Sequence, residues 1–320
     1  MKKLCPVWIL LCIGAGISFL TRSALADYKQ AVAYYTQGRF DKTIQELKPD
    51  LDQTPEWEFG HRLMGLSYLN LKNNALAISS LTRAVQLKST TFSTYQGLGQ
   101  AYFNMQRFDN SVQILNQGQQ FAKGTEEEYK LYHLRGSAYY RMERFNEAVN
   151  DLTAAIRNKS ADWADFSQLG IAYYNLNRYD EAIQALLRAI ALKPGQNATT
   201  EFLGKSYFKK GVAALSAKQY DQAIDLFRKA QENDLKNGFI PYNIAEAYLF
   251  KNNFPEAEKN LNRALELMPR SAEVFQRLGL VYEKQKKWDL ALNAYQKANE
   301  LKPSPGLKEA IDRINELKKR

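Results

Sequence analysis

A small residue followed three positions later by tyrosine recurs along the chain, mostly at intervals of 34 residues, and this repetition restricts the fold more than any other feature. Gly65 and Tyr68 begin the first regular copy, and Gly99 and Tyr102 begin the next, 34 residues later. Periods of this length are typical of arrays in which one small helical or strand unit stacks on the next. In the remaining copies the small residue is Ala31, Gly136, Gly170, Gly211, Ala245 or Gly279.

Each copy contains two amphipathic stretches. In the copy LGIAYYNLNRYDEAIQALLRAIALKP, apolar residues fall at helical spacing over 169–176 and 182–192. The polar pair Asn177-Arg178 separates the two stretches, and Pro194 with Gly195 ends the second. The pattern predicts a helical hairpin. A hairpin of this kind cannot bury both of its apolar faces alone, so it must stack on its neighbours.

The positions for a small residue, tyrosine, an aromatic residue, alanine, leucine or phenylalanine, a second alanine and proline are filled in most copies. In this respect the chain resembles the tetratricopeptide repeat family over nearly all of the sequence after residue 26. The resemblance implies an all-α fold, a right-handed α-solenoid of about eight helix-turn-helix repeats. It also implies that the first helix of each repeat lines a concave groove.

We expect the repeat array over 27–305 and a capping helix over 306–320, with Leu307, Ile311, Ile314 and Leu317 on one face. Two registers compete in the sixth repeat, because Gly204 and Gly211 both fit the pattern. Seven extra residues there would extend a helix by about two turns. This insertion is either a partner-binding ridge or a change in the path of the solenoid. The expected repeats are 24–57, 58–91, 92–125, 129–162, 163–196, 197–237, 238–271 and 272–305.

The first 26 residues have the layout of a secretory signal peptide: lysines at positions 2 and 3, an apolar run over 7–20, and Ala24-Leu25-Ala26 at the end. We expect cleavage after Ala26 and export, with a periplasmic location. Secretion and an uncleaved membrane anchor are the alternatives. In a eukaryotic secretory pathway, 158–160 and 197–199 would be glycosylation acceptors.

Composition agrees with an exported binding protein. The only cysteines, Cys5 and Cys12, lie within the signal segment, so cleavage would leave no disulfide and no thiol. The formal charge of +10 would fall to +7, because that segment carries three basic residues and no acid. A modest basic excess favours acidic partners but does not predict nucleic-acid binding.

If the first helices line the groove, the residues one and two places after each signature tyrosine should face a partner. Asparagine offers a donor and an acceptor to an extended peptide, and aromatic rings add contact area at a low entropic cost. The candidate groove residues are Tyr35, Asn70, Phe103, Asn104, His133, Tyr140, Arg141, Tyr174, Asn175, Phe208 and Lys209.

Two further patterns bear on binding. Arginine recurs in the turns at 39, 107, 144 and 178, either as a basic stripe or as ordinary solvated turns. Some family members hold a peptide carboxylate with lysine, arginine and asparagine from three adjacent first helices. Asn243 and Arg277 match two of those places, but Phe208 and Glu273 stand where lysines are needed. We therefore do not predict that clamp.

Catalytic chemistry has little support in the sequence. His61 and His133 are the only histidines, and neither has a nucleophile or a metal ligand at a suitable spacing. We expect no enzyme activity, no catalytic residues, no cofactor and no metal site.

The leading hypothesis is a periplasmic or cell-envelope scaffold that binds peptide or helix segments of other proteins, acidic ones included, without stable membrane insertion after cleavage. The alternative is a chaperone or carrier for unfolded or acidic polymer clients.

Overall fold

The computed structural model describes residues 22–157 and 161–319, and these residues form seventeen α-helices and one 3₁₀ turn with no strand. The chain divides within α9 into two compact parts, one ending at Gln168 and one beginning at Leu169. Each part is described separately. The expected signal sequence lies outside the described residues up to position 21, as does the expected glycosylation acceptor at 158–160.

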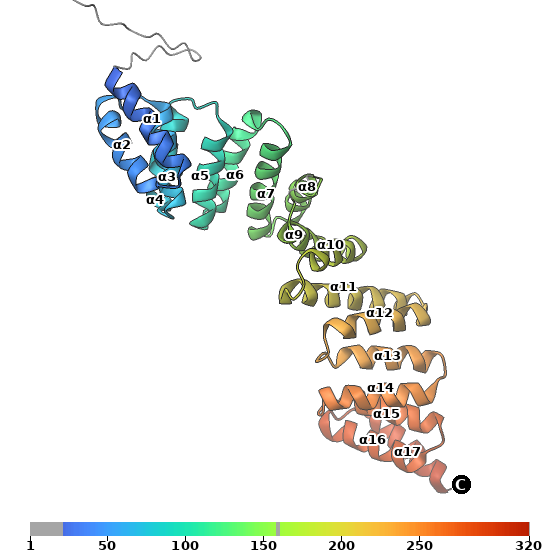
Figure 1. The fold of residues 1–320 in the computed structure, drawn as a ribbon. Helices are drawn as coiled ribbons and strands as arrows, with labels where there is room; N and C mark the ends of the chain where they lie inside the picture. Colours follow the sequence, from blue (N-terminus) through green and yellow to red (C-terminus); the bar gives the residue numbers. More distant parts are fainter. Residues whose placement is uncertain (1–21, 158–160, 320) are drawn as a thin grey trace, which may run out of the picture. The chain divides into compact units, whose positions relative to one another are not determined.

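The N-terminal part consists of helical hairpins in which each helix packs on the next along the chain (Figure 1). Its helices are α1 (Arg22–Thr36), α2 (Phe40–Gln53), α3 (Glu58–Asn70), α4 (Asn74–Gln86), α5 (Phe92–Asn104), α6 (Phe108–Gly118), α7 (Thr125–Arg141) and α8 (Phe145–Ala155), with the 3₁₀ turn η1 (Gln119–Phe121) after α6 and the start of α9 (Trp163–Asn175) at its end.

The C-terminal part continues the same arrangement and ends in an unpaired helix (Figure 1). After the rest of α9 come α10 (Tyr179–Leu192), α11 (Asn197–Ser216), α12 (Tyr220–Asn233), α13 (Phe239–Phe250), α14 (Phe254–Leu267), α15 (Ala272–Lys284), α16 (Trp288–Leu301) and α17 (Pro305–Lys319). Consecutive helices from α10 to α17 pack on one another. The all-α class and the α-solenoid arrangement are confirmed in the described residues.

The turn inside each hairpin has one recurring geometry. In the α5–α6 turn, Gln106 has a φ of 60°, and the backbone N–H of Arg107 donates to the carbonyl of the signature Tyr102 at 2.9 Å. Glu143 with Arg144, and Asn177 with Arg178, repeat this arrangement. A left-handed residue followed by this six-to-one hydrogen bond is the usual way to end a helix. The turn therefore satisfies carbonyls that the helix leaves unpaired.

The small signature residue sets how closely the paired helices approach. A Cβ added to Gly65 would lie 2.5 Å from Cγ of Leu81, sixteen residues later on the second helix. Leu81 is fully buried, so the glycine and the leucine fit directly against each other. Where the chain has alanine instead, at Ala31 and Ala245, that residue is also fully buried.

The same spacing settles the register of the sixth repeat. A Cβ on Gly211 would lie 2.6 Å from Phe227, which is also sixteen residues later and fully buried. Gly204 instead lies beside Asn233, the last residue of the second helix, α12. The packing follows Gly211, and the extra residues lengthen α11 at its N-terminal end to 20 residues.

The last helix, α17, covers the apolar side of the final hairpin. Leu307 and Ile314 are buried there against Tyr295 and Ala298 of α16, and Ile311 and Leu317 pack at the edge. Exposed lysine–carboxylate pairs also join successive hairpins in this part, among them Lys251 with Asp221, Lys287 with Glu258 and Lys318 with Asp289.

Among the described residues, no helix combines the length and apolar character needed to span a membrane.

Candidate partner-binding surface

The first helices of successive hairpins lie close to one another. In the N-terminal part α1 contacts α3, α3 contacts α5 and α5 contacts α7; in the C-terminal part α11 contacts α13. Among the described residues, consecutive second helices make no contact of similar extent. The stack is therefore tighter on the side of the first helices in the N-terminal part, and α11 and α13 have the same arrangement in the C-terminal part. We call this side the inner surface.

The expected aromatic row lies at the turn end of this surface and is only partly exposed. Each ring packs against the aromatic residue that starts its own second helix, five positions later: Tyr35 against Phe40, with centroids 5.4 Å apart, and Phe103 against Phe108, at 5.2 Å. Tyr140 and Tyr174 make the same contact with Phe145 and Tyr179. These rings thus join the two helices of a hairpin and still present an edge to the surface.

The next row of polar residues is exposed and is partly engaged within the protein. The side-chain amides of Asn70 and Asn175 donate to the carbonyls of Leu66 and Ile171, four residues earlier on their own helices. Asn104 instead reaches the preceding hairpin, where it donates to Asn74 at 3.0 Å. The asparagine oxygens are thereby held in a defined orientation on the surface.

Arg141 extends this row onto α7. Its guanidinium lies 5.1 Å from the ring centroid of Phe108, the ring that also packs on Phe103. The structure therefore brings Phe103, Asn104 and Arg141 onto adjoining first helices, α5 and α7.

The turn arginines are held by their own hairpins. Arg39, Arg107, Arg144 and Arg178 each lie 4.5–4.8 Å from the ring centroid of the signature tyrosine five residues earlier. Two of them also form bonds to a glutamate three residues later, Arg144 to Glu147 and Arg178 to Glu181. This hydrogen bond lowers the pKa of both glutamates. The arginines are parts of the turn, which accounts for their recurrence without a ligand.

His133 lies on the inner surface and is tied to a buried carboxylate. Its Nδ1 is 2.6 Å from Asp165 at the start of α9, and Asp165 is fully buried. The hydroxyl of Tyr129 also donates to Asp165 at 3.1 Å, as does the backbone N–H of Asp162. The bond to Asp165 raises the pKa of His133, although burial opposes it. His61 contacts the carbonyl oxygen of Pro55 at 3.0 Å.

In the C-terminal part, Tyr174, Phe208 and Lys209 line one narrow depression together with Ile240. Phe208 also packs against the buried Phe227, and Phe202 from the lengthened start of α11 packs on Tyr174 at 5.1 Å. Because the register follows Gly211, the residues one and two places after the signature-tyrosine position of this repeat are Leu215 and Ser216, not Phe208 and Lys209. The inserted turns of α11 therefore cover part of the Tyr174 ring, which we expected to face a partner.

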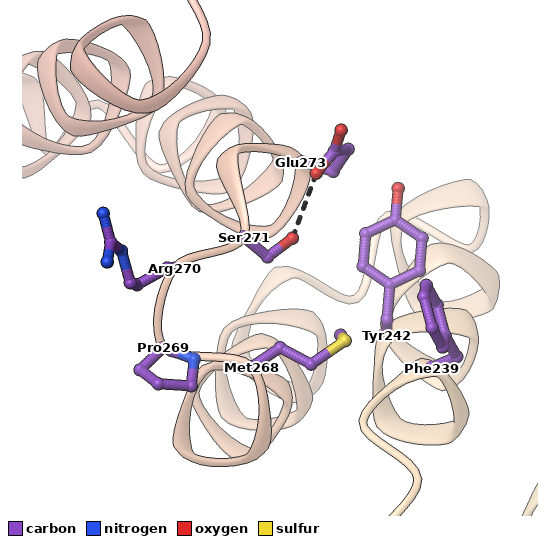
Figure 2. Close-up of a pocket in the computed structure, with 7 residues that line it drawn as sticks. All are labelled: Phe239, Tyr242, Met268, Pro269, Arg270, Ser271 and Glu273. Atoms are coloured by element: carbon purple, nitrogen blue, oxygen red, sulfur yellow. Dashed lines mark hydrogen bonds between the residues drawn. The ribbon is translucent and has the colours of Figure 1, made fainter.

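A larger open pocket was not predicted from the sequence. It lies between the N-terminal ends of α13 and α15, with a volume of about 740 Å³, and includes the connection between α14 and α15 (Figure 2). Phe239 and Tyr242 stand side by side on the α13 wall, and Met268 reaches toward them from the opposite side (Figure 2). The only sequence signal was Phe239 directly after Gly238, at the start of a first helix. The lining residues are Phe239, Tyr242, Met268, Pro269, Arg270, Ser271 and Glu273.

Sequence reasoning also missed a buried charge pair. Arg135 of α7 donates from Nε and Nη2 to the two oxygens of Asp151 on α8, at 2.6 and 2.8 Å. Its Nη1 donates to Asn116 and Gln119 at 2.7 Å each. Every terminus of this guanidinium has a partner, so the group serves the packing of α6, α7 and α8 rather than a ligand.

Among the described residues, no group of three or more histidine, cysteine, aspartate or glutamate side chains is placed to hold a metal ion.

Comparison with known proteins agrees with the repeat pattern. Models of the tetratricopeptide repeat match residues 63–91, 92–123, 133–197, 204–237 and 238–304, which together make up more than half of the chain. Heat shock protein STI1 of Saccharomyces cerevisiae is 32% identical over 111 residues, 34% of this chain and 19% of that protein. The human RNA polymerase II-associated protein 3 is 31% identical over 116 residues, 36% of this chain and 16% of that protein. The chain thus matches less than a fifth of the length of these relatives.

The chain is also similar to solved structures over part or most of its length. MamA from AMB-1 is 26% identical, covering 56% of this chain and 96% of its own, with a TM-score of 0.41. The C-terminal part of a TPR repeat-containing protein from Cytophaga hutchinsonii is 16% identical and covers 89% of this chain and 98% of its own, with a TM-score of 0.49. With the repeat matches spread along both compact parts, the chain belongs to the tetratricopeptide repeat family.

Proposed function

We propose that the protein is a scaffold that binds segments of other proteins on the inner surface formed by its first helices. The observation that carries this proposal is the run of exposed polar side chains beside partly exposed rings on adjoining first helices. Asn104 and Arg141 with Phe103 are the best-defined example. Such a surface offers hydrogen bonds to a peptide backbone and apolar area to its side chains.

All four turn arginines stack on a tyrosine, and Arg144 and Arg178 are also ion-paired, which weakens the alternative of a carrier that binds acidic polymers along an arginine stripe.

We also propose that the protein acts outside the cytoplasm, in the periplasm or cell envelope. The support is the sequence pattern of residues 1–26 and the restriction of both cysteines to that segment. The expected mature chain begins at Asp27. N-terminal sequencing of the protein isolated from the envelope fraction of its native cells tests this. A start at Met1 or Lys2 in that fraction would indicate an uncleaved anchor instead.

The binding role is tested by affinity capture with a triple variant, Asn70→Ala, Asn104→Ala and Arg141→Ala. All three side chains are exposed on first helices, so the fold should be retained, which circular dichroism checks. The matched control replaces the exposed residues Lys48, Gln113 and Asn150 of the second helices by alanine. We expect the groove variant to lose the partners that wild type and control capture. Equal capture by all three proteins would reject the inner surface as the binding site.

A further inference from the structure

The start of α13 and the connection before it carry the two most exposed large hydrophobic side chains among the described residues. Leu235, in the connection before α13, and Phe239, the first residue of the helix, are 67% and 61% exposed, the highest values among the large hydrophobic side chains described. The two residues are four positions apart, and Phe239 forms a wall of the open pocket between α13 and α15. An exposed ring that lines an open pocket marks an interaction site more often than an isolated exposed residue does.

The pocket is held in shape by contacts that do not depend on a ligand. Gly238 allows Met268 to approach the backbone, because a Cβ there would lie 2.5 Å from Cγ of Met268. The side-chain oxygen of Asn237 accepts from the backbone N–H of Phe239 at 3.1 Å, which fixes the start of α13. Tyr242 packs at the edge of the adjacent core. The apolar walls are therefore formed before any partner arrives, which lowers the entropic cost of binding.

The charged side chains at the rim of the pocket differ in whether they have a partner within the protein. Glu273 is occupied, because it accepts from Ser271 at 3.2 Å and from Lys302 at 3.3 Å (the former drawn in Figure 2). Arg270, in the connection between α14 and α15, has no ion-pair partner among the described residues and is exposed. Deeper on the same inner surface, Arg277 is paired with Glu246 at 2.8 Å. The cation left at this rim is thus Arg270.

Building on the proposed function, we propose that this pocket binds a bulky apolar side chain, aromatic or aliphatic, of a partner peptide whose neighbouring acidic residue pairs with Arg270. The ring of Phe239 and the thioether of Met268 supply the apolar contact. Arg270 also lines the pocket, and its side chain points away from the two rings (Figure 2). A peptide that places its apolar side chain against the rings and continues over the connection between α14 and α15 would bring its acid beside the guanidinium.

The test uses a phage-displayed library of random twelve-residue peptides, selected against the chain from Asp27 to Arg320. Enriched peptides should share a phenylalanine, leucine or similar residue next to aspartate or glutamate. Their synthetic, fluorescein-labelled forms are then titrated with wild type and variants. Replacing the apolar residue of the peptide by alanine should weaken binding about tenfold or more.

Two variants with matched controls locate the site. Phe239→Ala and Arg270→Glu should each weaken binding about tenfold, and Arg270→Glu should prefer the same peptide with lysine in place of its acid. Phe250→Ala removes a ring of similar exposure, 58%, from the other end of α13. Lys259→Glu changes an exposed charge on α14 outside the pocket. Both controls should bind within twofold of wild type.

The outcomes separate this proposal from the general binding role. If the enriched peptides bind the Phe239→Ala and Arg270→Glu variants as wild type does, but lose binding to the Asn70/Asn104/Arg141 triple variant, the pocket proposal is overturned and the scaffold role stands. If no peptide is enriched, or if the enriched peptides lack the apolar and acidic pair, the pocket proposal is also overturned. The scaffold role is then decided by the capture experiment alone.

Discussion

At the scale of single residues, each turn depends on a backbone conformation that its side chains do not favour. Lys72, Gln106 and Glu143 have φ values of 58–60°, in the left-handed region where a Cβ is disfavoured. Gly38 is the only glycine at this place in the described turns. The turns are kept by the hydrogen bonds that they make to the preceding helix, not by the preference of these residues.

Replacing Glu143 by glycine should therefore stabilise the protein. Removing the Cβ relieves the left-handed strain, and the higher entropy of glycine in the unfolded chain offsets part of the gain, leaving about 0.5–1 kcal/mol. Urea unfolding followed by circular dichroism measures this change. Glu143→Ala keeps the Cβ and serves as the control, which should show no stabilisation. A loss of stability in the glycine variant would contradict the turn geometry.

His133 should make stability depend on pH. Its pKa in the folded state is raised above the ordinary value of 6.5, because of its bond to Asp165. A raised pKa means that the folded state binds the proton more tightly, so the stabilisation is complete below pH 6.5 and is lost as the pH rises through the folded pKa. The acidic groups that face the imidazole are Asp165 and Asp162, and Tyr129 packs beside it.

The measurement compares wild type with His133→Gln by urea unfolding at about pH 5.5 and about pH 9. Wild type should exceed the variant in stability by more at the lower pH. The reverse order, or a difference that does not change with pH, would show that the protonated imidazole does not stabilise this contact.

At the scale of helices, the pairing of two helices in each hairpin could be predicted from the spacing of the apolar residues. The structure adds the contact that holds the pair, between a small residue and a large one sixteen positions later, as in Gly65 and Leu81. The register of α11 was open in the sequence because Gly204 lies 34 residues after Gly170, whereas Gly211 lies 34 residues before Ala245. Only the contact of Gly211 with Phe227, which depends on three-dimensional packing, distinguishes them.

The pocket at α13 was not predictable for a similar physical reason. An exposed Phe239 and a buried aromatic residue look the same in a helical pattern, and the width of the pocket depends on how Met268 lies against Gly238. Likewise, the sequence could not decide between a basic stripe and solvated turns for the turn arginines, because it cannot show that each stacks on the tyrosine five residues earlier.

The buried charge pair between α7 and α8 makes a prediction at this scale. Asp151→Asn keeps the shape of the side chain but leaves Arg135 buried without its counter-charge, at a cost of about 3 kcal/mol. The double variant Arg135→Met with Asp151→Leu removes both charges, so it should cost much less than the single variant. Denaturant unfolding of both variants decides this. A double variant less stable than Asp151→Asn would show that the pair stabilises the fold beyond satisfying its own charges.

At the scale of the whole molecule, each compact part exposes a continuous set of first helices on its inner surface, and the second helices lie on the opposite side of the stack. The fold could be predicted because the repeat imposes the same packing in each hairpin. The partner could not, because the exposed side chains that would select it are free of that packing constraint. The central claim is therefore about which side of the stack binds.

Site-specific photocrosslinking tests that claim most directly. Benzoylphenylalanine is introduced at Asn104, on the first helix of the third repeat, or at Gln113, on its second helix; both positions are exposed. Each protein is irradiated in cells that naturally produce the chain. The account predicts discrete crosslinked partners from Asn104 and few or none from Gln113. Equal crosslinking from both positions, or crosslinking from Gln113 alone, would contradict it.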